Sequence, residues 1–493
     1  MTKDKKYLSL IIVLILDIAL FMLFMLGTGA ILTGYHFIDD HVSISLYEAL
    51  QNTSLYELTK ANVIGDLTLR FRPLYFIELC LKTYFFGIDF NKWMLFSTIE
   101  GIITFMLLYL SAIKMKFTTV ESFLFSSIII FGKQFTPWYR TPNQENEGLL
   151  FVSILLLLLS IGFYGEKKLF SRWWYRIIVF MVMVISSLQK EAFCMMLPAY
   201  ILLIMHMDEQ TNGKSGFVTL VRKYLLLFIS IMAVFLYEIY FIMTQVGTQF
   251  AGYAGFDESS GIGVYLKGLY KTCTKNIQFY IIAFVLLVIV FVLANKKDAI
   301  KKIVDNKYLA LFGVFVIATQ LILHAKSTMF QRYIIPMIVA VSLVFIVFGL
   351  RIIRDNLKWY RISVGICSAL VLIGMIQSYQ MAESWAIDGR DGNELLSAVE
   401  GVIQDNPSAK ILSHIDDCEL DLSVEVWLNH YVESDVDFTY YADVDNSVSY
   451  DVLLITAKKY RKGKIFKQLG VDADSYTSIL SDDNKYVVLV LND

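Results

Sequence analysis

The segment "YLSLIIVLILDIALFMLFMLGTGAILTGYHFIDD", residues 7–40, joins a long apolar run to a pair of acids. It opens with an almost unbroken apolar run, longer than the about 20 residues that a helix needs to cross a bilayer. Two adjacent acids, Asp39 and Asp40, follow this run, with His36 and His41 on either side of them. The run also exceeds the apolar core of a cleavable signal peptide, so we expect a retained first membrane helix.

The composition of the whole chain agrees with this interpretation. Of its 493 residues, 56% are hydrophobic and 18% are charged, which is too apolar for a soluble protein and typical of a polytopic membrane protein. The segment 379–493 differs, because it holds 22 Asp and Glu against 9 Lys and Arg. No clustered positive charge of the kind that nucleic acid requires dominates the chain, so we expect no nucleic-acid partner.

About eleven apolar runs are long enough, or nearly long enough, to cross a membrane. They cover residues 8–34, 93–113, 117–132, 148–164, 175–189, 192–206, 222–244, 277–294, 308–323, 334–350 and 362–378. With the N-terminus in the cytoplasm, the cytoplasmic connections hold 21 Lys and Arg and the outer ones 13. Cytoplasmic loops carry an excess of these residues, so the pattern predicts this orientation. An odd number of spans then puts the C-terminal segment outside the cell membrane.

The first outer loop, residues 35–92, is far longer than the usual connection of about 4–6 residues. Two capping-box patterns, Ser45 with Glu48 and Ser54 with Glu57, predict the starts of two short helices. The apolar stretch "PLYFIELCLKTYFFGI" predicts a third. We expect these helices to lie along the membrane surface.

The chain from residue 379 onward predicts a small α/β domain, separate from a membrane domain over residues 1–378. "GNELLSAVEGVIQDNP" is an amphipathic helix pattern, "AKILSH" and "YDVLLITA" are typical of buried strands, and "YTSILSDDNKYVVLVL" predicts a hairpin. "KKYRKGKIFKQLG" predicts a basic helix that ends at Gly470. The predicted fold is therefore an α-helical polytopic membrane protein with a small extracytoplasmic α/β domain at its C-terminus.

The polar residues that could take part in catalysis or binding lie on the predicted outer side. Adjacent carboxylates can hold a divalent cation through oxygen ligands, or one of them can act as a general base. A phosphate group would in addition need cationic partners. The outer side offers Arg70, Arg72, Lys133, Arg140, Lys190, Lys326 and Arg332.

An acidic pair directly after the first span resembles the GT-C superfamily of polytopic glycosyltransferases, which use lipid-linked sugar donors. Here the pair is Asp39-Asp40. "RFRPLY" in the first loop and "QKEAFCMMLP" and "QRYIIP" at the starts of later spans are similar to bacterial members related to protein mannosyltransferases. The resemblance covers roughly residues 8–350.

The resemblance implies transfer of a sugar from a polyprenyl-phosphate donor to a glycan, lipid or protein acceptor outside the membrane, as part of cell-envelope polysaccharide biosynthesis. Asp39 or Asp40 would be the catalytic acid, and Asp40 the ligand of Mg²⁺ or Mn²⁺ if the enzyme uses a cation. Arg332 and Lys190 would face the donor phosphate. The full set of implied substrate-binding residues is Arg72, Arg140, Lys190, Glu191 and Arg332.

Two other classes of function stay open. A transporter or flippase for a lipid-linked glycan would place its site near the bilayer midplane, in interrupted helices of two repeated halves. The chain has only 6 Pro and no visible repeat. A non-catalytic envelope assembly protein would bind through its external domain. Three acids fall within predicted spans, Asp17, Glu100 and Glu238, and we expect them to form hydrogen bonds between helices.

Overall fold

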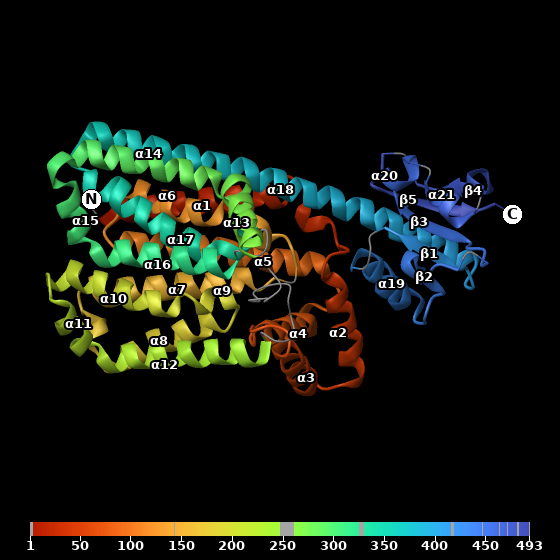
Figure 1. Cartoon of the computed structure of the whole chain (residues 1–493), viewed down its shortest axis with the longest axis horizontal. Coiled ribbons are helices and arrows are strands. Elements are labelled where there is room, and N and C mark those ends of the chain that lie inside the picture. Colours follow the sequence, from red (N-terminus) through yellow and green to blue (C-terminus); the bar gives the residue numbers. More distant parts are fainter. Residues whose placement is uncertain are drawn as a thin grey trace. The chain divides into compact units, whose positions relative to one another are not determined.

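The structure is a computed structural model. It describes residues 3–141, 143–246, 261–324, 330–415, 419–445, 447–462, 464–470, 472–480 and 483–492. The chain forms two compact units (Figure 1). Unit 1 comprises Met1–Leu23, Lys60–Glu78 and Phe96–Met381, and unit 2 comprises Phe24–Thr59, Leu79–Leu95 and Ala382–Asp493.

Long apolar helices make up most of the chain and identify it as a multi-pass membrane protein. The described residues contain eight helical segments long and apolar enough to cross a membrane: Tyr7–Met25, Phe90–Lys114, Glu145–Tyr164, Glu191–Asn212, Leu225–Val246, Gln278–Asp305, Gln331–Ile353 and Leu357–Asp405. Three shorter apolar helices are α6 (Thr119–Ile130), α8 (Trp173–Ser187) and α16 (Lys307–Leu323). Each of the predicted apolar runs overlaps one of these segments. Within unit 1 the helices run side by side (Figure 1).

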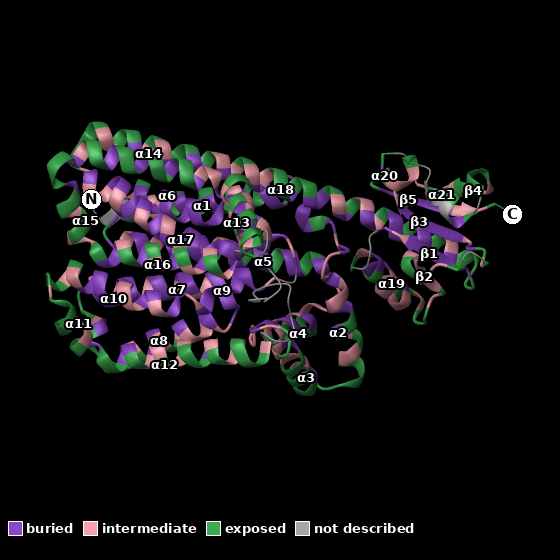
Figure 2. Ribbon diagram, viewed as in Figure 1, coloured by how far each residue is buried: buried purple, intermediate pink, exposed green. Residues whose placement is uncertain are grey.

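Burial within the bundle follows what a lipid-facing protein requires. The faces of α12 (Leu225–Phe241) and α14 (Gln278–Asn295) are largely exposed, whereas almost all of α17 (Ile335–Val344) is buried (Figure 2). Leu226 on α12, for example, is 81% exposed. Apolar side chains that point outward along a helix without a protein partner are suited to hydrocarbon and not to water.

The first membrane helix is shorter than predicted. The apolar run suggests a span over residues 8–34, but α1 (Lys3–Met25) ends nine residues earlier. The Thr28 hydroxyl donates a hydrogen bond to the Phe24 carbonyl (2.6 Å), and Gly29 adopts φ 83°, a conformation that glycine reaches without strain. The chain therefore turns after Met25, although its composition stays apolar.

The first loop contains three short helices, as predicted: α2 (Asp40–Asn52), α3 (Leu55–Leu67) and α4 (Tyr75–Phe86). Before α3, the Ser54 hydroxyl accepts a hydrogen bond from the Glu57 N–H (3.2 Å), as expected of a capping residue. The prediction for Ser45 is wrong. It lies inside α2, where its hydroxyl donates to the His41 carbonyl (3.2 Å), and the helix begins at Asp40 instead.

Unit 2 contains a mixed five-stranded sheet in the order β2-β1-β3-β5-β4. The strands are β1 (Ile411–His414), β2 (Phe438–Tyr440), β3 (Val452–Thr456), β4 (Tyr476–Ser478) and β5 (Tyr486–Leu491). The pairs β1–β2 and β1–β3 are parallel, and β3–β5 and β4–β5 are antiparallel. The predicted strands at β1 and β3 and the predicted β4–β5 hairpin are confirmed.

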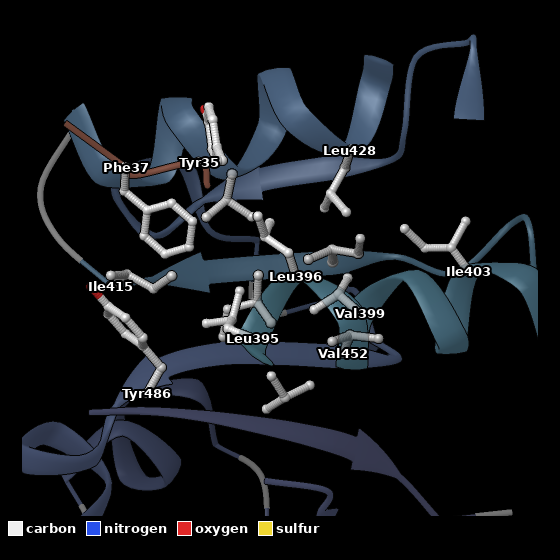
Figure 3. Close-up of a cluster of buried hydrophobic side chains, with 14 of the residues drawn as sticks. Tyr35, Phe37, Leu395, Leu396, Val399, Ile403, Ile415, Leu428, Val452 and Tyr486 are labelled. Atoms are coloured by element: carbon white, nitrogen blue, oxygen red, sulfur yellow. The ribbon is translucent and has the colours of Figure 1, made fainter. Parts of the chain in front are cut away.

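One face of this sheet packs against the segment that precedes the acidic pair. Tyr35 and Phe37 enter a core that includes Leu395, from the long helix before the sheet, and Val452 of the sheet (Figure 3). The Tyr35 hydroxyl donates a hydrogen bond to the carbonyl of Ser423 (2.8 Å), which lies in α19 (Glu419–Val432). The residues just before Asp39 are therefore held by the α/β core.

Helix α18 (Leu357–Asp405) is 49 residues long. It contains both the last predicted span and the amphipathic pattern that we expected to form a separate helix. The helix lies in unit 1 up to Met381 and in unit 2 from Ala382. It ends two residues before Pro407, because a residue that precedes proline is disfavoured in helical conformation.

Candidate active site

The two adjacent acids have different surroundings. Asp39 precedes α2 in a left-handed conformation with φ 69°, which is uncommon for a residue other than glycine and is often found at functional sites. Its side chain is partly exposed. Asp40 is the first residue of α2 and is fully buried, and its Oδ2 accepts a hydrogen bond from the His36 N–H (2.9 Å). Asp40 thus stabilises the turn that presents Asp39.

The neighbouring histidines also hold this turn. The His36 ring stacks on Trp385 with centroids 4.0 Å apart, and its Nε2 lies 2.7 Å from the Thr33 hydroxyl. A side chain at Gly389 would approach His36 to 2.4 Å, so this close packing requires glycine. His41 Nδ1 lies 2.7 Å from the Ser423 hydroxyl. Both rings therefore help to hold this segment in place.

A divalent cation at Asp40 does not fit the described residues. They bring no three His, Cys, Asp or Glu side chains together in a group that could hold a metal ion. Asp40 is buried and already accepts a backbone hydrogen bond. Hard cations such as Mg²⁺ need several oxygen ligands, so we derive no step through a metal.

The predicted substrate-binding residues lie in unit 1, and a buried ion pair is at their centre. Lys190 Nζ lies 2.6 Å from Glu145 Oε1, and each side chain is only 2% exposed. The same ammonium group lies 4.1 Å from the centroid of the Tyr333 ring. Glu145 begins α7 (Glu145–Tyr164), and Lys190 immediately precedes α9 (Glu191–Cys194). The polar sequence around Glu145, "TPNQENEG", is typical of a solvated loop, but the structure buries this carboxylate.

Arg332 contacts the same tyrosine. Its Nη2 donates a hydrogen bond to the Tyr333 hydroxyl (2.9 Å), and its Nη1 lies 3.4 Å from Asn143 Oδ1. Asn143 in turn donates to the carbonyl of Arg140 (2.6 Å). Burial raises the pKa of Tyr139 to about 12, although the nearby charges of Arg332 and Arg140 oppose that shift. Arg140 and Arg332 therefore belong to one electropositive region.

The end of the first loop adds further charges to this region. Arg70 Nε lies 3.6 Å from Glu191 Oε1, which also accepts a hydrogen bond from the Phe71 N–H (3.3 Å). Arg72 binds Asp66 with two guanidinium nitrogens, at 2.9 Å for both Nε–Oδ2 and Nη2–Oδ1. Burial raises the pKa of Asp66 and the Arg72 interaction partly opposes that shift. Arg72 thus has a carboxylate partner within its own loop.

His324 is a residue of this region that the sequence reasoning missed. Its ring stacks on Tyr333 at 6.1 Å, and its Nε2 is buried without a hydrogen-bond partner among the described residues. Burial, together with the charge of Lys190, lowers its pKa to about 4. The only sequence signal was its position at the end of a span, shortly before "QRYIIP". Lys326, also predicted for the outer side, lies outside the described residues.

Two of the three acids within the spans join helices, as predicted. Glu100 accepts a hydrogen bond from Asn146 (2.9 Å), and Glu238 accepts one from Ser187 (2.7 Å). The Asp17 carboxylate is buried and has no hydrogen-bond partner among the described residues.

A bundle of long apolar helices with a C-terminal α/β unit defines the fold of a multi-pass membrane protein, and comparison with solved structures finds a similar fold. The chain is similar to ArnT from Cupriavidus metallidurans bound to undecaprenyl phosphate, with a TM-score of 0.50 and 12% identity over 99% of this chain and 98% of that one. The apo structure of ArnT gives a TM-score of 0.51 with the same identity and coverage. No protein-family model matches the chain. No curated protein matches it either.

Proposed function

We propose that this protein is a membrane glycosyltransferase that transfers a sugar from a polyprenyl-phosphate donor to an acceptor outside the membrane. The observation that carries the proposal is the charge cluster of unit 1, in which four distant segments bring together Arg70, Lys190, Glu145 and Arg332. Burying charged groups is costly, and ionisable groups in such surroundings cluster at functional sites. The similarity in fold to ArnT, whose structure contains undecaprenyl phosphate, supports a polyprenyl-phosphate ligand.

Arg332 is the residue that we assign to the donor phosphate. Its guanidinium is partly exposed and is oriented by the hydroxyl of Tyr333. A guanidinium can bind a phosphate through two parallel charge-assisted hydrogen bonds. Lys190 is paired with Glu145, so we assign it an indirect role. Its positive charge contributes to the electrostatic potential at the phosphate, and its ammonium group holds the ring of Tyr333 in place.

Asp39 is the residue that we assign to the acceptor. In the proposed step its carboxylate takes the proton of an acceptor hydroxyl. The acceptor oxygen then bonds to the anomeric carbon while the bond from that carbon to the phosphate oxygen breaks. Polyprenyl phosphate leaves with the electron pair of that bond, and a cationic partner stabilises its charge.

Binding of undecaprenyl phosphate tests the donor assignment. The protein is reconstituted in nanodiscs, and binding is measured by native mass spectrometry for wild type, Arg332→Ala and Arg332→Lys. We expect Arg332→Ala to weaken binding about tenfold or more, and Arg332→Lys to recover only part of it, since lysine cannot bind bidentately. Arg222→Ala removes an exposed charge elsewhere and is the matched control. Equal binding by all four proteins would remove Arg332 from the site.

The alternatives make different predictions for the donor. A flippase would move a lipid-linked glycan across the membrane without breaking its sugar–phosphate bond. An assembly protein would be indifferent to changes at Asp39. Release of free polyprenyl phosphate that depends on Asp39 therefore separates the transferase from both.

A further inference from the structure

Positive charge is concentrated in one short segment of the C-terminal part of the chain. Of the 9 Lys and Arg between residues 379 and 493, six lie within residues 458–467, and this segment contains no acid. The remainder of that part carries all 22 of its Asp and Glu.

The structure divides this segment into two short helices, α20 (Ala457–Arg461) and α21 (Lys464–Leu469), and not the single helix that we predicted. Side chains of a strand alternate between the two faces of a sheet. Val452 and Leu454 join the core shown in Figure 3, whereas Leu453 and Ile455 join a second core with Tyr460 and Phe466. The basic helices therefore cover the face opposite to the one that holds Tyr35 and Phe37.

One base of α20, the partly buried Lys459, lies beside an aromatic pair. Lys459 Nζ donates a hydrogen bond to the His414 carbonyl (3.0 Å), and the His414 ring stacks on Tyr441 with centroids 3.7 Å apart. His414 and Tyr441 stand at the carboxyl ends of the parallel strands β1 and β2, and α20 follows the carboxyl end of β3. Ligands of open α/β sheets commonly bind at this edge.

Two bases of this segment form no ion pair within the described part of the chain. Lys458 and Lys462 are exposed, and neither forms an ion pair with another residue in the described part of the chain. By contrast, Lys485 of the same unit pairs with Asp388 at 2.8 Å. We define the basic edge as Lys458, Lys459, Arg461 and Lys462 together with the His414–Tyr441 pair.

We propose that the basic edge binds an acidic glycan, a polysaccharide with carboxylate or phosphate groups on its sugars. An aromatic ring offers an apolar face against which a sugar can pack, and the bases match its acidic groups. As a statement about the acceptor, the inference rests on the proposed function, because a transferase would recognise its acceptor chain there. Glycan binding itself requires no catalysis.

The surrounding charge favours a flexible glycan over a membrane surface. Charges act over a Debye length of about 8 Å at physiological salt. A flexible chain can contact the basic edge alone, whereas a flat anionic bilayer would also approach other parts of a segment, residues 379–493, that carries 22 Asp and Glu. The basic edge therefore fits a narrow polyanion.

The test measures binding to the full-length protein in nanodiscs of neutral lipid by isothermal titration calorimetry. The probes are oligogalacturonate, a dextran oligosaccharide of the same length as the uncharged control, and vesicles of phosphatidylglycerol. We expect wild type to bind only oligogalacturonate, with an affinity that falls as salt is raised. Lys458→Gln/Lys462→Gln should reduce that affinity about fivefold to tenfold, in proportion to two lost charge contacts.

The matched control is Arg390→Gln/Lys410→Gln, which removes the same charge from exposed positions elsewhere in unit 2. It should bind oligogalacturonate nearly as wild type does. Absence of oligogalacturonate binding, an equal loss in both double variants, or stronger binding to the vesicles would overturn the inference. Undecaprenyl phosphate binding is measured on the same samples, so a failure here is distinguishable from a failure of the proposed function.

Discussion

Asp39 and Asp40 are adjacent in sequence, but their environments assign them different tasks. Asp39 is partly exposed in a left-handed backbone conformation, and Asp40 is buried and accepts the His36 N–H. From the sequence the two acids could not be ranked. The ranking depends on backbone conformation and burial, which a two-letter motif does not contain.

The paired asparagine variants test this division of roles. Asp39→Asn keeps the size of the side chain and removes the base, so we expect the turnover number to fall about 10²–10⁴-fold with little change in thermal stability. Asp40→Asn should lower the melting temperature more than Asp39→Asn, because the carboxylate at position 40 is buried and hydrogen-bonded. Turnover and melting curves are measured on the same preparations. Full activity in both variants would leave the pair as a helix end only.

The partly buried position of His41 should make the protein less stable at acidic pH. Burial lowers its pKa below the ordinary value of 6.5, and the nearby Asp39 opposes that shift only in part. The unfolded chain therefore takes up a proton at His41 more readily than the folded one. The contribution of His41 to the free energy of unfolding is complete above pH 6.5 and is lost as the pH falls. We expect the melting temperature to drop by a few degrees between pH 7.5 and 5.5. His41→Gln should flatten that slope, and an unchanged slope would contradict the assignment.

At the scale of elements, an ion pair joins two segments that are distant in sequence. Lys190 lies in the connection between α8 and α9, and Glu145 lies at the start of α7. The sequence indicated Lys190 as a candidate phosphate ligand in "QKEAF", but it offered no sign of its partner 45 residues away. Pairing between distant segments depends on how helices pack, and hydrophobic periodicity does not encode it. Helix existence was predictable because a membrane span needs only a long apolar run.

Removing one partner of this pair should be costly. Glu145→Gln leaves the Lys190 ammonium buried without its counter-charge, and such changes cost about 3–5 kcal/mol. We expect a clear drop in the melting temperature of the detergent-solubilised protein. The double variant Lys190→Met/Glu145→Leu should recover much of the loss, because it removes both charges together. Additive losses in the double variant would show that the two side chains do not act as a pair.

For the whole molecule, composition and apolar runs were sufficient to predict a multi-pass membrane protein. The comparison shows an ArnT-like fold, which agrees with the fold expected from the motif and its neighbours. The end of the first helix was not evident, because residues 26–34 contain no charged side chain and the apolar run continues through them. The chain turns there through Thr28 and Gly29. The sequence also did not show that α18 is one continuous helix. Its composition changes from apolar to polar near residue 379, although the helical periodicity continues.

The orientation remains a prediction from the distribution of Lys and Arg. In a variant without the five native cysteines, single cysteines replace Ser434, Lys168 and Lys297. We expect Ser434→Cys to react with a membrane-impermeant maleimide on intact cells, and the other two only after permeabilisation, as the positive-inside rule requires. The reverse pattern would place the C-terminal unit in the cytoplasm.

The most direct test of the central proposal is turnover of the donor. Nanodisc-embedded protein is given a panel of polyprenyl-phosphate sugars with radiolabelled sugar and a cell-envelope extract as the source of acceptor. We predict that wild type releases free polyprenyl phosphate from one donor and moves the label to the acceptor, while Arg332→Ala and Asp39→Asn do so at least about 10²-fold more slowly. If wild type leaves the sugar–phosphate bond of every donor intact, or if both variants release polyprenyl phosphate at the wild-type rate, the proposal is contradicted.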